Sequence, residues 1–99
     1  HGMPPYGRLA ALIISGNEYD EVERVARNLA RNCPAEDGVT VLGPAPAPLS
    51  ILRGRHRWRL LLKARRDSNV RVILRHWLAR VRIRGNVRVQ IDVDPYSFL

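Results

Sequence analysis

The segment from Arg53 to Arg66, RGRHRWRLLLKARR, changes polarity with a period of two. Successive side chains of a β-strand point to opposite faces, so this alternation predicts one long strand with an apolar face and a basic face. The expected apolar face is His56, Trp58, Leu60, Leu62 and Ala64, and the opposite face is Arg55, Arg57, Arg59, Leu61 and Lys63. A row of cations along an extended strand is suited to contacting phosphates.

Charge is distributed unevenly along the chain. The 99 residues carry a net charge of +8, and seven of the seventeen Lys and Arg residues lie in the basic segment, which has no acid. Residues 1–37 hold six of the nine acids and four Arg, so the remainder has thirteen bases against Asp67, Asp92 and Asp94. This asymmetry predicts one basic side of the folded domain and favours a nucleic-acid partner.

Hydrophobic periodicity and turn residues divide the chain into four strands and two amphipathic helices. The predicted strands are 9–15, 39–42, 51–65 with a bend at Gly54, and 86–93. The expected N-caps are Asn17 for the first helix, which ends before Pro34, and Asp67 or Ser68 for the second. The GPAPAPLS segment that follows the second strand is expected to be an extended polyproline arm.

The element order β-α-β-β-α-β predicts an α+β, ferredoxin-like split βαβ fold. Right-handed crossovers place both helices on one face of a four-stranded antiparallel sheet, with the first and third strands in the centre. The open face then carries Arg57, Arg59, Leu61 and Lys63 beside Arg88, Gln90 and Asp92. The first strand, LAALIIS, is apolar on both sides, so we expect part of the open face to be covered in a longer protein.

Several conspicuous residues have structural explanations. Trp58 alternates with inward Leu residues, so core packing is favoured over base stacking. Trp77 has the spacing of a core residue on the second helix, whose inner face also includes Val70, Ile73, Leu74, Leu78 and Val81. Asp92 and Asp94 lack a third metal ligand, so pairing with local Arg residues is expected. His56 and His76 have no catalytic partner at a readable spacing.

Length limits what the chain does by itself. Ninety-nine residues make one domain and are too few for a motor or a Rossmann enzyme. We expect residues 1–6 to be a cloning remnant and leader, and residues 7–99 to be a single domain of a longer chain. No apolar stretch approaches the length of a membrane span. The single Cys33 is expected to pack inward and suits a reducing cytoplasm.

Three motifs in order resemble the C-terminal domain of the bacterial primosomal replication-restart helicases, the PriA family. They are LIISG leading into a helix, VLGPAPAPLSILRGRHRWRLLLKA, and the closing VRVQIDVDPYSFL. The resemblance implies a fold like that of ribosomal protein S10 and a parent ATP-dependent, 3′-to-5′ DNA helicase that is cytoplasmic and nucleoid-associated. ATP, magnesium and zinc are implied for that parent. This chain has no phosphate-loop motif and one Cys, so it is expected to be non-catalytic and without a cofactor.

The resemblance also implies contact with forked or single-stranded DNA. The candidate contact residues are Arg53, Arg55, Arg57, Arg59, Lys63, Arg65 and Arg66. The family docks the acidic tail of single-stranded-DNA-binding protein through an Arg near the second helix, which points to Arg65 or Arg66 here. An alternative is a docking module that packs on the helicase core and meets primosome proteins. An independent RNA-binding protein follows from fold analogy only. We expect a monomer that binds no membrane.

Overall fold

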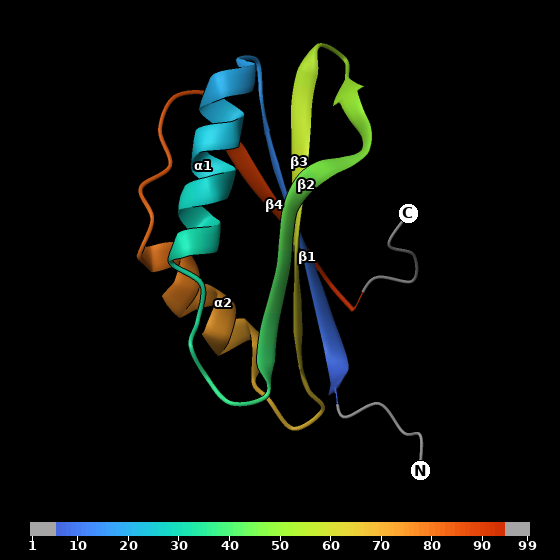
Figure 1. Cartoon of the computed structure of the whole chain (residues 1–99), viewed down its shortest axis with the longest axis vertical. Coiled ribbons are helices and arrows are strands. Elements are labelled where there is room, and N and C mark those ends of the chain that lie inside the picture. The colour runs from blue at the N-terminus through green and yellow to red at the C-terminus, as the bar shows by residue number, and fades with distance from the viewer. Residues whose placement is uncertain (1–5, 95–99) are drawn as a thin grey trace.

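The computed structural model describes residues 6–94, which form four strands and two helices in the predicted order (Figure 1). The strands are β1 (Tyr6–Gly16), β2 (Val39–Leu52), β3 (Arg55–Arg65) and β4 (Arg88–Val93), and the helices are α1 (Tyr19–Arg31) and α2 (Val70–Ala79). All strand pairs are antiparallel, in the order β2-β3-β1-β4. Both helices lie on one side of the sheet. The ferredoxin-like α+β prediction is confirmed.

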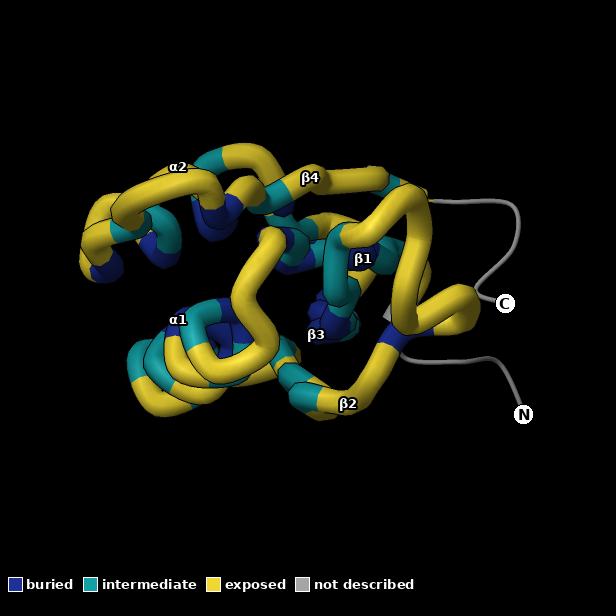
Figure 2. Tube along the Cα trace, turned by 90° about the horizontal axis from the view of Figure 1, so that it is seen from above, coloured by how far each residue is buried: buried dark blue, intermediate teal, exposed yellow. Residues whose placement is uncertain are grey.

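The core lies between the helices and the inner face of the sheet, where the buried segments of both layers face one another (Figure 2). Leu12 of β1 pairs with Leu60 of β3 and with Ile91 of β4, so these three side chains share that face. Leu12 and Leu60 are fully buried, and Trp58 is 6% exposed within the same core cluster. The core assignment of Trp58 is therefore confirmed.

Both helices bury the faces that their periodicity predicts. The buried residues are Val22, Val25, Ala26 and Leu29 of α1, and Val70, Ile73, Leu74 and Trp77 of α2. The indole Nε1–H of Trp77 donates a hydrogen bond of 2.9 Å to the carbonyl oxygen of Leu29, so one buried contact ties the two helices together. Neither helix is long and apolar enough to cross a membrane.

Both predicted helix caps are wrong. Glu18 is the N-cap of α1 and makes no side-chain cap hydrogen bond. Asn17 instead connects the end of β1 to the loop before β4, because its backbone N–H donates a hydrogen bond of 3.0 Å to Oδ1 of Asn86. The N-cap of α2 is Asn69, whose side chain accepts a hydrogen bond from the Val72 backbone N–H. Asp67 and Ser68 fall in the turn before it.

The expected polyproline arm is also wrong, since the GPAPAP segment belongs to β2. Ala45 pairs with Arg59 and Pro46 with Trp58, with register shifts between Leu42 and Ala45 and between Pro46 and Ile51. An edge strand tolerates proline because the missing N–H can face outward, away from the ladder. The segment is thus extended, as expected, but it is paired with β3.

Smaller differences concern both ends of the described chain. The first strand begins at Tyr6 rather than residue 9, and the last begins at Arg88 rather than residue 86. Ile91 lies on the inner face, as expected, but it is still 38% exposed, because β4 is an edge strand with a neighbour on one side only. The expected leader, residues 1–6, lies outside the described residues apart from Tyr6.

Candidate nucleic-acid interface

The sheet face opposite the helices carries the basic row that the alternation predicts. Register pairs Arg59 of β3 with Ile13 of β1, and Ile13 with Gln90 of β4. One step further along, Ser15 lies between Arg57 and Arg88 in the same way. Cations from two strands therefore flank β1 on this open face.

An apolar band crosses the open face beside the cations. Ala11 pairs with Leu61 of β3, which in turn pairs with Leu42 of β2. Leu42 is 45% exposed, whereas Ala11 is buried. The two-sided apolarity of the first strand thus produces a partly exposed hydrophobic surface. What covers this surface in a longer protein stays a prediction.

The β2–β3 hairpin leans toward the side of the sheet away from the helices (Figure 1 and Figure 2). Its turn is Arg53 and Gly54, with φ angles of 54° and 78°, between the paired residues Leu52 and Arg55. Two successive positive φ angles match the right-handed strand twist of a two-residue hairpin. The turn brings the Arg53 side chain to the open face.

Arg55 reaches across β1 to the loop before β4. Its NH2 group donates to the carbonyl oxygen of Ser15 at 3.1 Å and to that of Asn86 at 2.8 Å. NH1 lies 3.4 Å from Oδ1 of Asn17. These partners are uncharged, so they hold the guanidinium in place without cancelling its charge.

Arg57 fills the irregular part of β2. Four residues, 47–50, lie between Pro46 and Ile51, whose β3 partners Trp58 and His56 are separated by Arg57 alone. NH1 of Arg57 donates to the carbonyl oxygens of Pro48 and Leu49, at 2.8 and 2.9 Å. The bulge therefore satisfies its carbonyl groups with a side chain from the neighbouring strand.

Charge pairing differs between the two layers of the domain. Two arginines of α1 pair with carboxylates of the same helix, Arg24 with Glu21 at 2.5 Å and Arg27 with Glu23 at 2.8 Å. Among residues 6–94, neither Arg55 nor Arg57 forms an ion pair with a carboxylate. The positive charge of these open-face arginines is therefore not neutralised by local acids.

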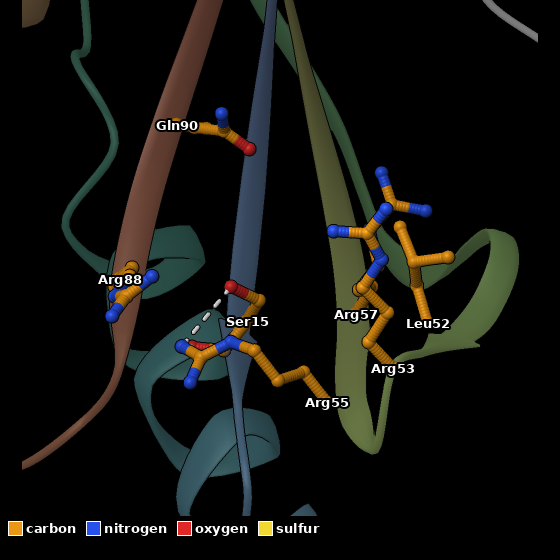
Figure 3. Close-up of a pocket in the computed structure, with 7 residues that line it drawn as sticks. All are labelled: Ser15, Leu52, Arg53, Arg55, Arg57, Arg88 and Gln90. Carbon is orange, nitrogen blue, oxygen red and sulfur yellow. Dashed lines mark hydrogen bonds between the residues drawn. The ribbon is translucent and has the colours of Figure 1, made fainter.

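A hollow of about 420 Å³ lies between the hairpin and β4 (Figure 3). Arg53 and Arg57 extend from the hairpin side, Arg88 from β4, and Arg55 crosses the space between them. We call this group the arginine hollow. The sequence analysis places Arg88 on the open face but does not include it among the contact residues. Its position near the hairpin arginines depends on strand register, because Ser15 of β1 pairs with both Arg57 and Arg88.

The candidates Arg65 and Arg66 lie at the far end of β3, about 30 Å from the hairpin at the usual strand rise. Nε of Arg65 is 3.6 Å from Oδ1 of Asp67, and its side chain lies over Gly38. The Arg66 side chain lies over Gly7. The seven predicted contact residues are therefore spread along the whole length of β3, and their contact with DNA stays a prediction.

A second hollow, of about 340 Å³, lies at the start of α2. Sequence reasoning missed its two basic residues, Arg8 of β1 and Arg71 of α2, which line it together with Asp67, Ser68, Asn69 and Val70. Arg8 also donates from Nε to Oδ2 of Asp94 at 2.9 Å. The expected pairing of a C-terminal aspartate with a local arginine is confirmed for Asp94.

The Asp94 carboxylate connects the end of β4 to β1. Its Oδ1 accepts a 2.9 Å hydrogen bond from the Leu9 backbone N–H, and this bond is the main reason that its pKa is lowered. Partial burial opposes the shift, and Arg8 adds to it. Within residues 6–94, no three His, Cys, Asp or Glu side chains come together in a way that could hold a metal ion.

The sequence matches the family model described as Primosomal protein N C-terminal domain over residues 1–96. The chain belongs to this family. The match covers all the strands and helices described above. Both hollows are therefore built from residues of this primosomal C-terminal domain. The resemblance drawn from the three sequence motifs is confirmed.

Curated relatives of this primosomal domain carry the name replication restart protein PriA. The chain is 35% identical over 96 residues to the protein from Rickettsia conorii and 38% identical over 96 residues to that from Synechocystis sp.. It is 27% identical over 104 residues to the protein from Bacillus subtilis. These matches include 95 to 97% of this chain, but the chain spans only 11 to 15% of the relatives' length.

Proposed function

We propose that this domain is a non-catalytic DNA-binding module in replication restart, and that it contacts forked or single-stranded DNA mainly through phosphates. The observation that carries the proposal is the charge of the open face. Arg55 and Arg57 are oriented by neutral acceptors, so their guanidinium groups keep a full charge in a fixed place. Phosphate contacts of this kind give affinity with little dependence on sequence.

The relatives' name, replication restart protein PriA, supports a DNA substrate over an RNA substrate. We further propose that the domain is one part of a longer 3′-to-5′ helicase. In this proposal, ATP hydrolysis and the magnesium and zinc sites belong to the rest of that protein. The domain contributes an anion-binding surface that keeps the DNA near the motor.

A salt titration tests the proposal. Fluorescence anisotropy with labelled single-stranded and forked DNA should give a log-log slope of about 0.7 to 0.9 per phosphate engaged. Replacing Arg57 and Arg59 together by Ala should weaken both complexes and reduce the slope by up to about two. The matched control is Arg31→Ala with Arg75→Ala, which removes the same charge from exposed helix positions.

Circular dichroism should show that both double variants remain folded. If the Arg57 and Arg59 variant binds both DNAs as tightly as the parent chain does at every salt concentration, the open face is not the DNA surface. Equal losses in the two double variants would mean that net charge alone governs binding. That result would also reject the open face.

The hollow at the start of α2 supports a second candidate function, the docking of an acidic protein tail. Arg8 and Arg71 line it, and Asn69 caps the adjoining helix, whose N-terminus favours negative charge. A terminal carboxylate could accept two hydrogen bonds from one guanidinium. The binding partner in this proposal is the tail of single-stranded-DNA-binding protein.

A peptide titration separates the two functions. In nuclear magnetic resonance spectra, an acidic tail peptide should shift amides around Arg71 and Asn69, and single-stranded DNA should shift amides on β3 and β4. Arg71→Ala should weaken peptide binding and leave DNA binding nearly unchanged. Tail docking at this hollow is rejected if the peptide instead shifts the same open-face amides as DNA does.

A further inference from the structure

We infer that the arginine hollow is a discrete phosphate-binding site of the domain, which seats one phosphate group of a nucleic-acid strand. The inference rests on the proposed DNA-binding function and assigns to it a particular place on the open face. The hollow has a volume of about 420 Å³, which is within the range of sites that enclose small ligands. A phosphate with its attached sugar is a ligand of suitable size.

The residues that line the hollow favour a negatively charged ligand. Four guanidinium groups line it, from Arg53, Arg55, Arg57 and Arg88, and no carboxylate is among the lining residues within the part of the chain that the structure describes. The uncharged polar groups are Ser15 and Gln90. Planar guanidinium groups match the oxygens of a phosphate bidentately, so a phosphate satisfies several of them at once.

The arginines are held in place before any ligand arrives. The NH2 group of Arg55 donates hydrogen bonds to the carbonyl oxygens of Ser15 and Asn86. The NH1 group of Arg57 donates to the carbonyl oxygens of Pro48 and Leu49. Each guanidinium has further N–H groups for which no hydrogen bond is made among residues 6–94. A side chain that is already ordered loses less entropy when it binds, so this arrangement favours affinity.

The turn supplies an independent observation. Arg53 occupies a left-handed backbone conformation, with φ of 54°, at a hairpin position where Asn, Asp or Gly is usual. An L-residue with a long side chain is less stable there than Asn or Gly. A strained conformation at the rim of a basic hollow indicates a functional role for the side chain that occupies it.

The test uses substitutions that suit the local backbone. Arg53→Asn removes one guanidinium group and puts a residue that favours positive φ into the turn. Arg88→Gln removes the guanidinium group on β4. The double variant should bind a short oligothymidine about tenfold more weakly, with a salt slope shallower by one to two. The matched control, Arg31→Gln with Arg75→Gln, removes equal charge from the helices and should change the affinity far less.

The source of the phosphate is resolved with two oligonucleotides, one with a 5′ phosphate and one with a 5′ hydroxyl. If the site seats a terminal phosphate, the phosphorylated strand binds the parent chain more tightly, and the double variant loses that difference. If it seats an internal phosphate, the double variant weakens both strands equally. Either result supports the site. Amides of Ser15 and Gln90 should shift on titration in both cases.

The site is overturned if the double variant binds both oligonucleotides as the parent chain does, or no more weakly than the matched control. It is also overturned if inorganic phosphate shifts the Ser15 and Gln90 amides but DNA does not. These outcomes are distinct from failure of the proposed function. If the proposed DNA-binding function failed, the parent chain itself would show no salt-dependent DNA binding, or the Arg57 and Arg59 double variant would bind DNA as tightly as the parent chain does.

Discussion

Trp77 donates its indole N–H to the carbonyl oxygen of Leu29 across the interface between α2 and α1. The indole is fully buried, and Trp77 is the largest of the fully buried side chains. A polar group on a large aromatic residue needs a partner when buried, and the last turn of α1 provides one. This contact links the two helices on the covered face of the sheet.

Replacing Trp77 by Phe should lower the free energy of unfolding by about 1 to 3 kcal/mol, because it removes the hydrogen bond and part of the ring volume. Trp58→Phe, which changes a core aromatic without a hydrogen bond to Leu29, is the matched comparison and should cost less. Chemical denaturation measures both. Equal losses would show that the contact between Trp77 and Leu29 adds nothing beyond ring volume.

The lowered pKa of Asp94 makes stability depend on acid pH. A carboxyl group whose pKa is lower in the folded state stabilises the fold fully above the usual aspartate pKa of about 4. That contribution is lost as the pH falls through the lower folded value. Arg8→Gln should raise the pKa of Asp94 only part of the way, because the Leu9 N–H is the larger cause. Carbon-detected titration of the Asp94 carboxyl group measures this, and an unchanged pKa would contradict it.

Two glycines with positive φ should respond differently to alanine. Gly54, at φ of 78°, has open space where a Cβ would be, with no other atom within 4 Å, so Gly54→Ala should cost about 1 to 2 kcal/mol from backbone strain alone. At Gly43, with φ of 102°, a Cβ would lie 2.8 Å from the Arg59 carbonyl oxygen. Gly43→Ala should therefore cost roughly 2 to 4 kcal/mol. Thermal unfolding that ranks Gly54→Ala as worse would contradict the β2 geometry.

Arg57 has both a structural and an electrostatic role, and two substitutions separate them. Arg57→Lys keeps the charge but cannot bridge the Pro48 and Leu49 carbonyl oxygens in the same way, so it should cost about 1 kcal/mol of stability and weaken DNA binding less than Arg57→Ala does. Arg57→Ala should lose stability and DNA affinity together. If Arg57→Lys binds DNA as weakly as Arg57→Ala does, the role of Arg57 is positional rather than electrostatic.

The sequence predicts the fold well where side-chain periodicity determines it. The alternation through β3 assigns each face correctly, because a shift of one residue would bury Arg57 and Arg59 and expose Trp58. The same periodicity places the inner faces of both helices. The predicted caps are wrong because Asn17, Ser68 and Asn69 have similar local preferences. Asn17 instead bonds the distant Asn86 side chain through its backbone N–H, and Asn69 rather than Ser68 accepts the capping bond from the Val72 backbone N–H.

Features that depend on two distant segments could not be predicted. The prolines of β2 lack an N–H, which is compatible with a free arm or with an edge strand, and only the pairing with β3 distinguishes the two. Arg88 joins the arginine hollow because β1 lies between it and Arg57 in register, and because the hairpin leans over that face. Neither relationship leaves a local pattern in the sequence.

The central position of β1 has a consequence for synthesis of the chain. β1 is the first strand made, yet one of its two neighbours is β4, the last strand of the sheet. On the ribosome, that side of β1 keeps its backbone N–H and C=O groups without a strand partner until β4 has emerged. Exposed strand edges invite pairing with other chains, so the nascent domain passes through an interval in which association competes with folding.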